Sequence, residues 1–78
     1  GNAASADPFQ FIHAKTGAFI AYAPVKMNNT FFGYTDMFGR INISVAQGNY
    51  NCSTIFLGKK LSRSLKITGN TRLSVVLF

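Results

Sequence analysis

The stretch that decides the fold is "TDMFGRINISV", which spans residues 35–45. It opens on a polar pair that can start a turn, because Asp36 can accept hydrogen bonds from backbone amides a short way further on. Gly39 then supplies a backbone conformation that other residues avoid. Over residues 40–45 apolar and polar residues alternate, which predicts a half-buried strand. The residues expected to face the core are Ile41, Ile43 and Val45.

The chain on both sides of this stretch consists of short extended segments separated by turn signals. Glycine, asparagine or proline interrupts the apolar pattern about every eight to twelve residues, and no apolar repeat has a helical period. This spacing is typical of an antiparallel β-sandwich or barrel. The expected strands are 9–14, 19–27, 30–35, 40–45, 50–57, 61–67 and 71–78. In the last two strands the residues expected to face the core are Leu65, Ile67, Leu73, Val75 and Leu77.

The length allows one small domain. The 78 residues are 47% hydrophobic, which is too apolar for a disordered segment. A chain of this size buries only about 60–65% of its unfolded surface, so we expect a thin core. Residues 1–8 are small and polar and are expected to form a flexible leader, followed by a folded domain over 9–78. No apolar run approaches the roughly 20 residues that span a bilayer, so no transmembrane segment is predicted.

Several short motifs, taken in order, carry a family resemblance. They are "KTG" (15–17), "APV" (23–25), "YTDMFGRI" (34–41), "QGNY" (47–50), "FLGKK" (56–60), "ITGN" (67–70) and "LSVVL" (73–77). Over residues 9–78 their order and spacing resemble the carboxypeptidase regulatory-like domains. The resemblance implies an all-β fold, a seven-stranded antiparallel Greek-key β-sandwich of the transthyretin-like (prealbumin-like) type. The sequence departs from the family pattern at Met37 and Phe38, where a small polar residue is common, and in the aromatic first strand with His13.

The resemblance also implies a class of roles. Domains of this family are usually non-catalytic and accompany metallocarboxypeptidases or lie at the N-terminal side of bacterial outer-membrane receptors. Others are spacers, adhesive modules or carbohydrate-associated modules of secreted and surface proteins. The expected location is therefore secreted, periplasmic or outer-membrane-associated. A fold by itself does not select one of these roles.

Residues that could carry out catalysis are few. His13 is the only histidine, Cys52 is the only cysteine, and the two acids are Asp7 and Asp36. Asp7 falls in the expected leader and Asp36 in a turn, so neither is predicted to orient His13 as a general base. With no helix terminus or histidine expected beside it, Cys52 is predicted to be a buried and unreactive thiol. We therefore predict no enzyme, no metal site and no cofactor.

Basic residues gather in the last third of the chain. The chain has 8 Lys and Arg against 2 acids, a net charge of +6, which suits a polyanionic partner. Five of the 8 cations lie between residues 59 and 72. Lysines on edge strands also prevent sheet-to-sheet aggregation, and this structural role is the favoured interpretation. The five cations are Lys59, Lys60, Arg63, Lys66 and Arg72.

Aromatic residues gather around the first hairpins: Phe31, Phe32, Tyr34 and Phe38 lie in one hairpin, and Phe19 and Tyr22 lie upstream of it. Phe31 and Phe32 are adjacent, so one of them is expected to point outward from its strand. Exposed aromatic rings can stack on sugars or dock a partner protein, although most of these rings are expected to fill the thin core.

The sequence thus predicts a non-catalytic secreted or cell-surface β-sandwich module that acts as a scaffold or as a docking domain for a partner protein or glycan. The alternative is an electrostatic binder of nucleic acid or another polyanion through the basic C-terminal half, with nucleic acid the less favoured ligand. The oligomeric state is left open. The candidate partner-binding residues are Phe32, Tyr34, Phe38, Lys59, Lys60 and Arg63.

Overall fold

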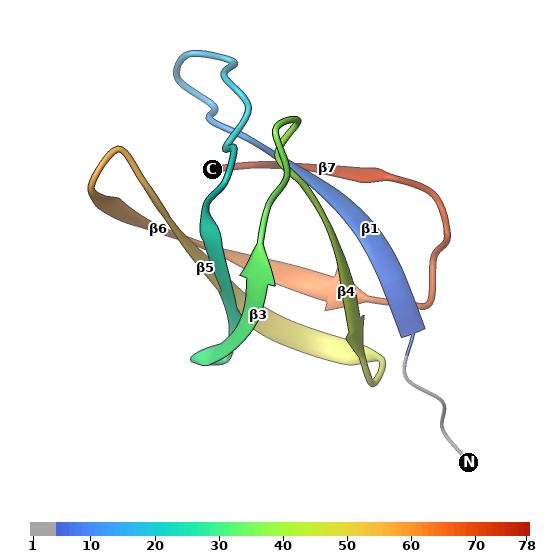
Figure 1. Ribbon diagram of the computed structural model, residues 1–78. Coiled ribbons are helices and arrows are strands. Elements are labelled where there is room, and N and C mark those ends of the chain that lie inside the picture. Colours follow the sequence, from blue (N-terminus) through green and yellow to red (C-terminus); the bar gives the residue numbers. More distant parts are fainter. Residues whose placement is uncertain (1–4) are drawn as a thin grey trace.

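A computed structural model describes residues 5–78, and over this range the chain is all-β, with two sheets and no helix (Figure 1). The predicted all-β class is therefore confirmed. The strands are β1 (Ser5–Ile12), β2 (Pro24–Met27), β3 (Thr30–Tyr34), β4 (Arg40–Val45), β5 (Gly48–Phe56), β6 (Lys59–Ile67) and β7 (Ser74–Leu77).

The strands form a three-stranded sheet of order β4-β1-β7 and a four-stranded sheet of order β3-β2-β5-β6. β1 pairs antiparallel with β4 but parallel with β7, so the expectation of a purely antiparallel sandwich was wrong for one pair. The physical reason is the connection. β7 follows β6 of the opposite sheet through residues 68–73, and no hairpin forces it to run against β1.

The first strand begins earlier than the sequence indicated. Residues 5–8 were expected in a flexible leader, but they pair with β4, and Asp7 is buried and accepts a hydrogen bond from the Thr68 amide at 3.2 Å. Residues 1–4 of the expected leader lie outside the described residues. Pro8 is tolerated in this strand because the ladder with β7 begins only at Phe9.

The second strand is shorter than predicted. Only Pro24–Met27 of the expected range 19–27 is a strand, and Tyr22 adopts a left-handed backbone with φ of 53° just before it. The turn after the strand was predicted correctly. Asn28 and Asn29 have φ of 50° and 69°, the conformation of a two-residue hairpin turn that matches the twist of the flanking strands.

The core lies between the two sheets. Its buried members are Phe9, Phe11, Ile20, Ala23, Val25, Met27, Ile43, Cys52, Leu65 and Ile67. The inward positions predicted for Ile43, Leu65 and Ile67 are confirmed, and Ile41 and Val45 pack against the core at its margin.

In β7 the predicted inward side was wrong. Leu73, Val75 and Leu77 are exposed, and Val76 and Phe78 pack against the core instead. Apolar residues occupy both faces of this segment, so alternation could not select the inward one. Pairing selects it, because Val76 lies opposite the buried Phe11 and the rings of Phe11 and Phe78 meet edge to face at 4.9 Å.

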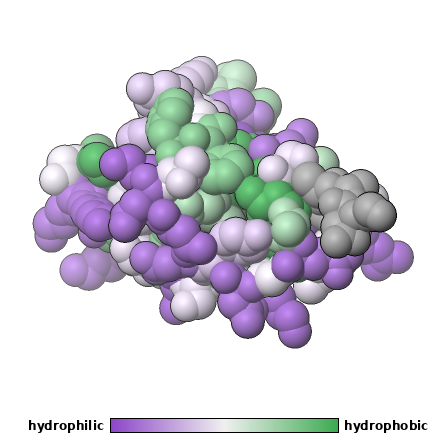
Figure 2. Space-filling view, turned by 90° about the horizontal axis from the view of Figure 1, so that it is seen from below, coloured by the Kyte–Doolittle hydropathy of each residue, from purple (hydrophilic) through white to green (hydrophobic). Residues whose placement is uncertain are grey.

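Many apolar side chains consequently reach the surface, and Figure 2 shows hydrophobic residues gathered in the middle of one face among hydrophilic ones. A thin two-sheet core leaves such side chains outside because it offers few inward positions. The large exposed apolar residues are Phe19, Tyr22, Phe31, Tyr34, Met37, Phe38, Ile55, Leu57, Leu73, Val75 and Leu77.

One buried polar side chain predicts a stabilising substitution. Thr54 lies between Val25 and Leu61 in the four-stranded sheet, and its hydroxyl has no hydrogen-bond partner within residues 5–78. Thr54→Val keeps the shape and removes the unpaired hydroxyl, so we expect a gain of about 1–2 kcal/mol in the free energy of unfolding. Thr54→Ser keeps the hydroxyl and loses a methyl group, and we expect it to lose about 1 kcal/mol. Chemical denaturation of both variants checks the pair, and a destabilised valine variant would contradict the argument.

Candidate functional site

At one end of the two sheets the loop over residues 13–23 lies beside the turn over residues 35–39 (Figure 1). Exposed aromatic side chains of the loop and the turn meet there. The rings of Phe19 and Phe38 contact each other edge to face, with centroids 6.0 Å apart. The guanidinium carbon of Arg40 lies 5.5 Å from the centre of the Phe38 ring. We call this surface the aromatic rim, and its members are Phe19, Tyr22, Met37, Phe38 and Arg40, all exposed.

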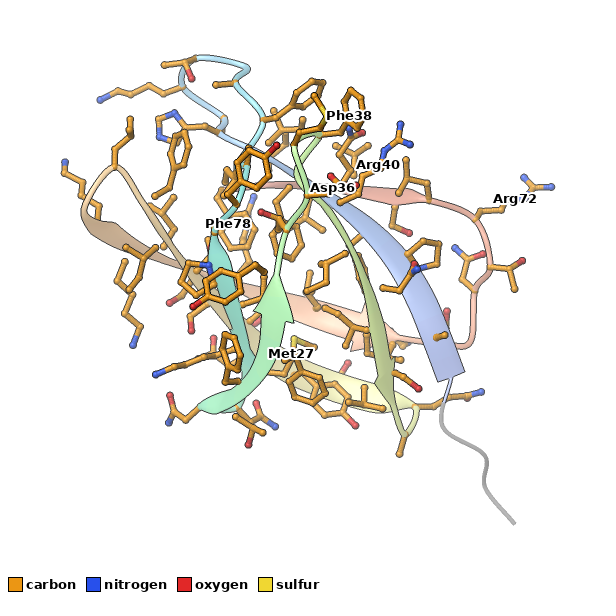
Figure 3. All side chains as sticks on the ribbon, in the orientation of Figure 1. Met27, Asp36, Phe38, Arg40, Arg72 and Phe78 are labelled. Carbon is orange, nitrogen blue, oxygen red and sulfur yellow. The ribbon has the colours of Figure 1, made fainter. Side chains whose placement is uncertain are left out.

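The turn that carries Phe38 is held by Asp36. Its Oδ1 accepts hydrogen bonds from the amides of Phe38 at 2.8 Å and Arg40 at 2.9 Å. The Phe38 carbonyl accepts a further hydrogen bond from the side-chain amide of Gln10 at 2.9 Å. Asp36 is therefore a turn former, as predicted, and Phe38 is presented on a fixed backbone. Figure 3 shows Asp36, Phe38 and Arg40 close together at this end.

An open hollow of about 560 Å³ adjoins the rim at Arg40. It extends over β1 and β4 to the connection before β7, and its lining mixes polar and apolar side chains. The hollow is a concave surface next to the projecting aromatic residues. Its lining residues are Pro8, Phe9, Tyr34, Asp36, Arg40, Ile41, Asn42, Thr71 and Leu73.

The aromatic residues of β3 point in different directions. Phe31 and Tyr34 are exposed and meet edge to face, with ring centroids 5.3 Å apart. Phe32 is half-buried and packs against the core, so of this predicted set Tyr34 is accessible and Phe32 much less so. The pairing of β2 with β3 shifts register between Val25 and Lys26, which allows two residues only three apart to share the outer face.

The basic residues do not form one cluster. Lys59 and Lys60 are exposed at the start of β6, whereas Arg63 donates a hydrogen bond from Nε to the Leu77 carbonyl at 2.7 Å. Arg63 thus joins the edges of the two sheets. Arg72 projects on another side of the molecule, away from Phe38 (Figure 3).

The histidine has structural contacts. His13 Nδ1 and the Thr16 hydroxyl are 3.1 Å apart, and the imidazole lies against Phe56 with ring centroids 5.3 Å apart. Both contacts fit a residue that orders the loop after β1. Cys52 is fully buried, and burial raises the pKa of its thiol to about 12. Because the thiolate is the nucleophilic form, this thiol is unreactive near neutral pH.

The buried thiol makes the stability of the protein depend on alkaline pH. Between pH 9 and pH 12 the thiol ionises in the unfolded chain but stays protonated in the folded one, because its pKa rises from 9.0 to about 12. The folded state then binds more protons, so stability falls by up to about 1.4 kcal/mol per pH unit. We expect Cys52→Ala to lose stability at pH 7 and to lack this component of the pH dependence. Urea unfolding of the wild type and of Cys52→Ala from pH 7 to pH 11 checks this expectation. If the free energy of unfolding fell with pH equally in both proteins, the buried thiol would not be the cause.

Within residues 5–78 no group of three or more histidine, cysteine or acidic side chains is arranged to hold a metal ion. Over the same residues, no helix has the length and hydropathy needed to cross a membrane. No protein-family model matches the sequence, and the search of curated proteins finds no match either.

The structure adds residues to the site that were not among the predicted partner-binding residues. Phe19 and Tyr22 reach this end because the loop before β2 folds back onto the turn before β4, whereas Met37 and Arg40 flank Phe38 in the chain. A hydrogen bond from the Tyr22 amide to the Asp36 carbonyl, at 3.3 Å, joins the loop to the turn. The only sequence signal was the density of aromatic residues near both loops, which does not say which of them meet.

Proposed function

We propose that this protein is a non-catalytic docking module and that the aromatic rim binds a partner protein. The observation that carries the proposal is the contact of Phe38 with Phe19 and with Arg40 on the surface. Met37 precedes Phe38 in the chain and Tyr22 donates its amide to the Asp36 carbonyl, and both side chains are exposed. Aromatic residues, methionine and arginine are the types enriched at the centres of protein interfaces. Their burial by a partner supplies most of the binding free energy, because a few such anchors dominate an interface.

The fixed backbone of the rim supports the same role. The turn that carries Phe38 is closed by two hydrogen bonds to the Asp36 carboxylate and by the Gln10 side chain, so little entropy is lost when a partner immobilises it. The hollow next to Arg40 supplies a place for a projecting side chain of the partner.

We infer further that the chain is a carboxypeptidase regulatory-like domain with a transthyretin-like Greek-key topology, from a secreted, periplasmic or outer-membrane-associated bacterial protein. The order of the sequence motifs supports this assignment, and the two sheets of order β4-β1-β7 and β3-β2-β5-β6 are compatible with it. The non-catalytic role rests on the structural contacts of His13 and the buried state of Cys52.

The test is site-specific photo-crosslinking from the rim in an envelope fraction of the source cells. A photoreactive phenylalanine analogue at residue 38 is expected to capture one defined protein, and the same analogue at the exposed residue 57, outside the rim, is expected not to capture it. Purified partner should then bind Phe19→Ala about tenfold or more weakly than the wild-type chain, and Leu57→Ala as tightly as the wild type. Equal capture from residues 38 and 57, or a hydrolytic activity that these changes leave intact, would overturn the proposal.

A further inference from the structure

A second surface, distinct from the rim, lies on the outer face of the four-stranded sheet. Register places Phe31 of β3, Lys26 of β2, Ser53 of β5 and Ser62 of β6 in one row across the four strands. The neighbouring strands of such a row are about 4.8 Å apart, so the row is a continuous strip of surface.

A neighbouring row completes this surface. Tyr34 lies opposite Pro24, and Ile55 lies opposite Lys60. Between the two rows lies a hollow of about 110 Å³, whose floor includes the buried Ser53. Its lining residues are Pro24, Lys26, Asn29, Ser53, Thr54, Ile55 and Lys60. We call the two rows and this hollow the lysine face.

The charged side chains that line the hollow of the lysine face are both positive. Lys26 and Lys60 line the hollow from strands on opposite sides of β5. The chain has 2 acidic side chains: Asp7 is buried in the three-stranded sheet, and Asp36 accepts hydrogen bonds within its own turn. Within residues 5–78 neither acidic side chain therefore belongs to this face, and an anionic group in the hollow would be attracted by both ammonium groups.

The other side chains of the lysine face indicate what kind of anion fits. Phe31 and Tyr34 form an exposed edge-to-face pair beside the hollow, and such rings offer flat apolar surface to the face of a sugar. Ser53 and Asn29 bring a hydroxyl and an amide, which can exchange hydrogen bonds with sugar hydroxyls. A nucleic acid would instead need a longer run of cations to follow its phosphates. Arg63 does not extend the pair of Lys26 and Lys60, because its Nε donates to the Leu77 carbonyl.

We propose that the lysine face binds an acidic saccharide of the uronate type, with its carboxylate between Lys26 and Lys60 and a sugar ring against Phe31 and Tyr34. The proposal does not depend on the aromatic rim. It assigns two of the chain's positive charges, those of Lys26 and Lys60, to binding a carboxylate.

The test is isothermal titration of the protein with oligogalacturonate at low and at physiological salt. We expect Lys26→Gln/Lys60→Gln to weaken binding by about tenfold or more, and the charge-matched control Lys15→Gln/Arg72→Gln to change it by less than about twofold. Tyr34→Ala should weaken binding without changing its salt dependence. The fully methyl-esterified oligosaccharide, which keeps the rings and loses the charge, should bind much more weakly.

Three outcomes would overturn the proposal: no binding of oligogalacturonate at low salt, equal losses in the two double variants, or tighter binding of a single-stranded oligonucleotide of equal charge. The last outcome would identify the face as a nucleic-acid surface. Phe38→Ala, which alters only the rim, should bind oligogalacturonate as the wild type does, so failure of this proposal and failure of the rim proposal are distinguishable.

Discussion

Gly39→Ala is expected to destabilise the protein by about 3–5 kcal/mol, a large part of the roughly 4–12 kcal/mol that holds a domain of this size together. Gly39 has φ of 73°, and a Cβ atom there would lie 2.6 Å from the Phe11 carbonyl oxygen and 3.2 Å from the Ile20 amide nitrogen. Both neighbours are backbone atoms of the core, and the Ile20 amide donates to the Phe11 carbonyl at 2.9 Å. Neither can move without breaking that hydrogen bond.

Gly58→Ala is the matched control. Gly58 has a similar φ of 77°, but a Cβ atom there meets nothing within 4 Å. Its substitution has only the left-handed backbone penalty of about 1–2 kcal/mol. Thermal unfolding should therefore show a loss of roughly 15 °C or more for Gly39→Ala and a clearly smaller loss for Gly58→Ala. Similar losses for the two variants would show that close packing around Gly39 is not what restricts it to glycine.

The extent to which the sequence predicted this fold is clear from the strand that follows Gly39. In β4 apolar and polar residues alternate, so the buried position of Ile43 could be read from the pattern alone. In β7 both faces carry apolar residues, and only the pairing of Val76 with Phe11 determines which side is buried. Long-range pairing likewise brought residues 5–8 into β1, because small polar residues give no local signal for a strand.

The candidate site was predictable to a similar degree. Asp36 and Phe38 stand in a turn whose chemistry is local, and both were identified from it. Phe19 and Tyr22 belong to a loop whose path depends on hydrogen bonds to distant residues. Their position near Phe38 therefore could not be predicted from the sequence. The lysine face depends in the same way on strand register, since Lys26 and Lys60 are far apart in the chain.

The residue that fixes that loop is Thr35, and its replacement has the second large expected effect. The buried Thr35 hydroxyl donates a hydrogen bond to the Ile20 carbonyl at 2.6 Å and accepts one from the Ala23 amide at 2.9 Å. Thr35→Val keeps the shape of the side chain but leaves both backbone groups buried without this partner. An unpaired buried group costs about 1–3 kcal/mol, so we expect a loss of about 2–4 kcal/mol in the free energy of unfolding.

Thr35→Ser distinguishes the contribution of the two hydrogen bonds to stability from the contribution of side-chain packing. It keeps the hydroxyl and loses one methyl group, so we expect it to lose only about 1 kcal/mol. Urea unfolding should show a clearly higher free energy of unfolding for the serine variant than for the valine variant. Hydrogen exchange of the Ala23 amide should accelerate in the valine variant alone. Since Thr35 also holds the loop that carries Phe19 and Tyr22, the valine variant should bind a rim partner more weakly even where it is fully folded. If valine and serine proved equally stable, packing of the methyl group, and not the two hydrogen bonds, would be what anchors the rim.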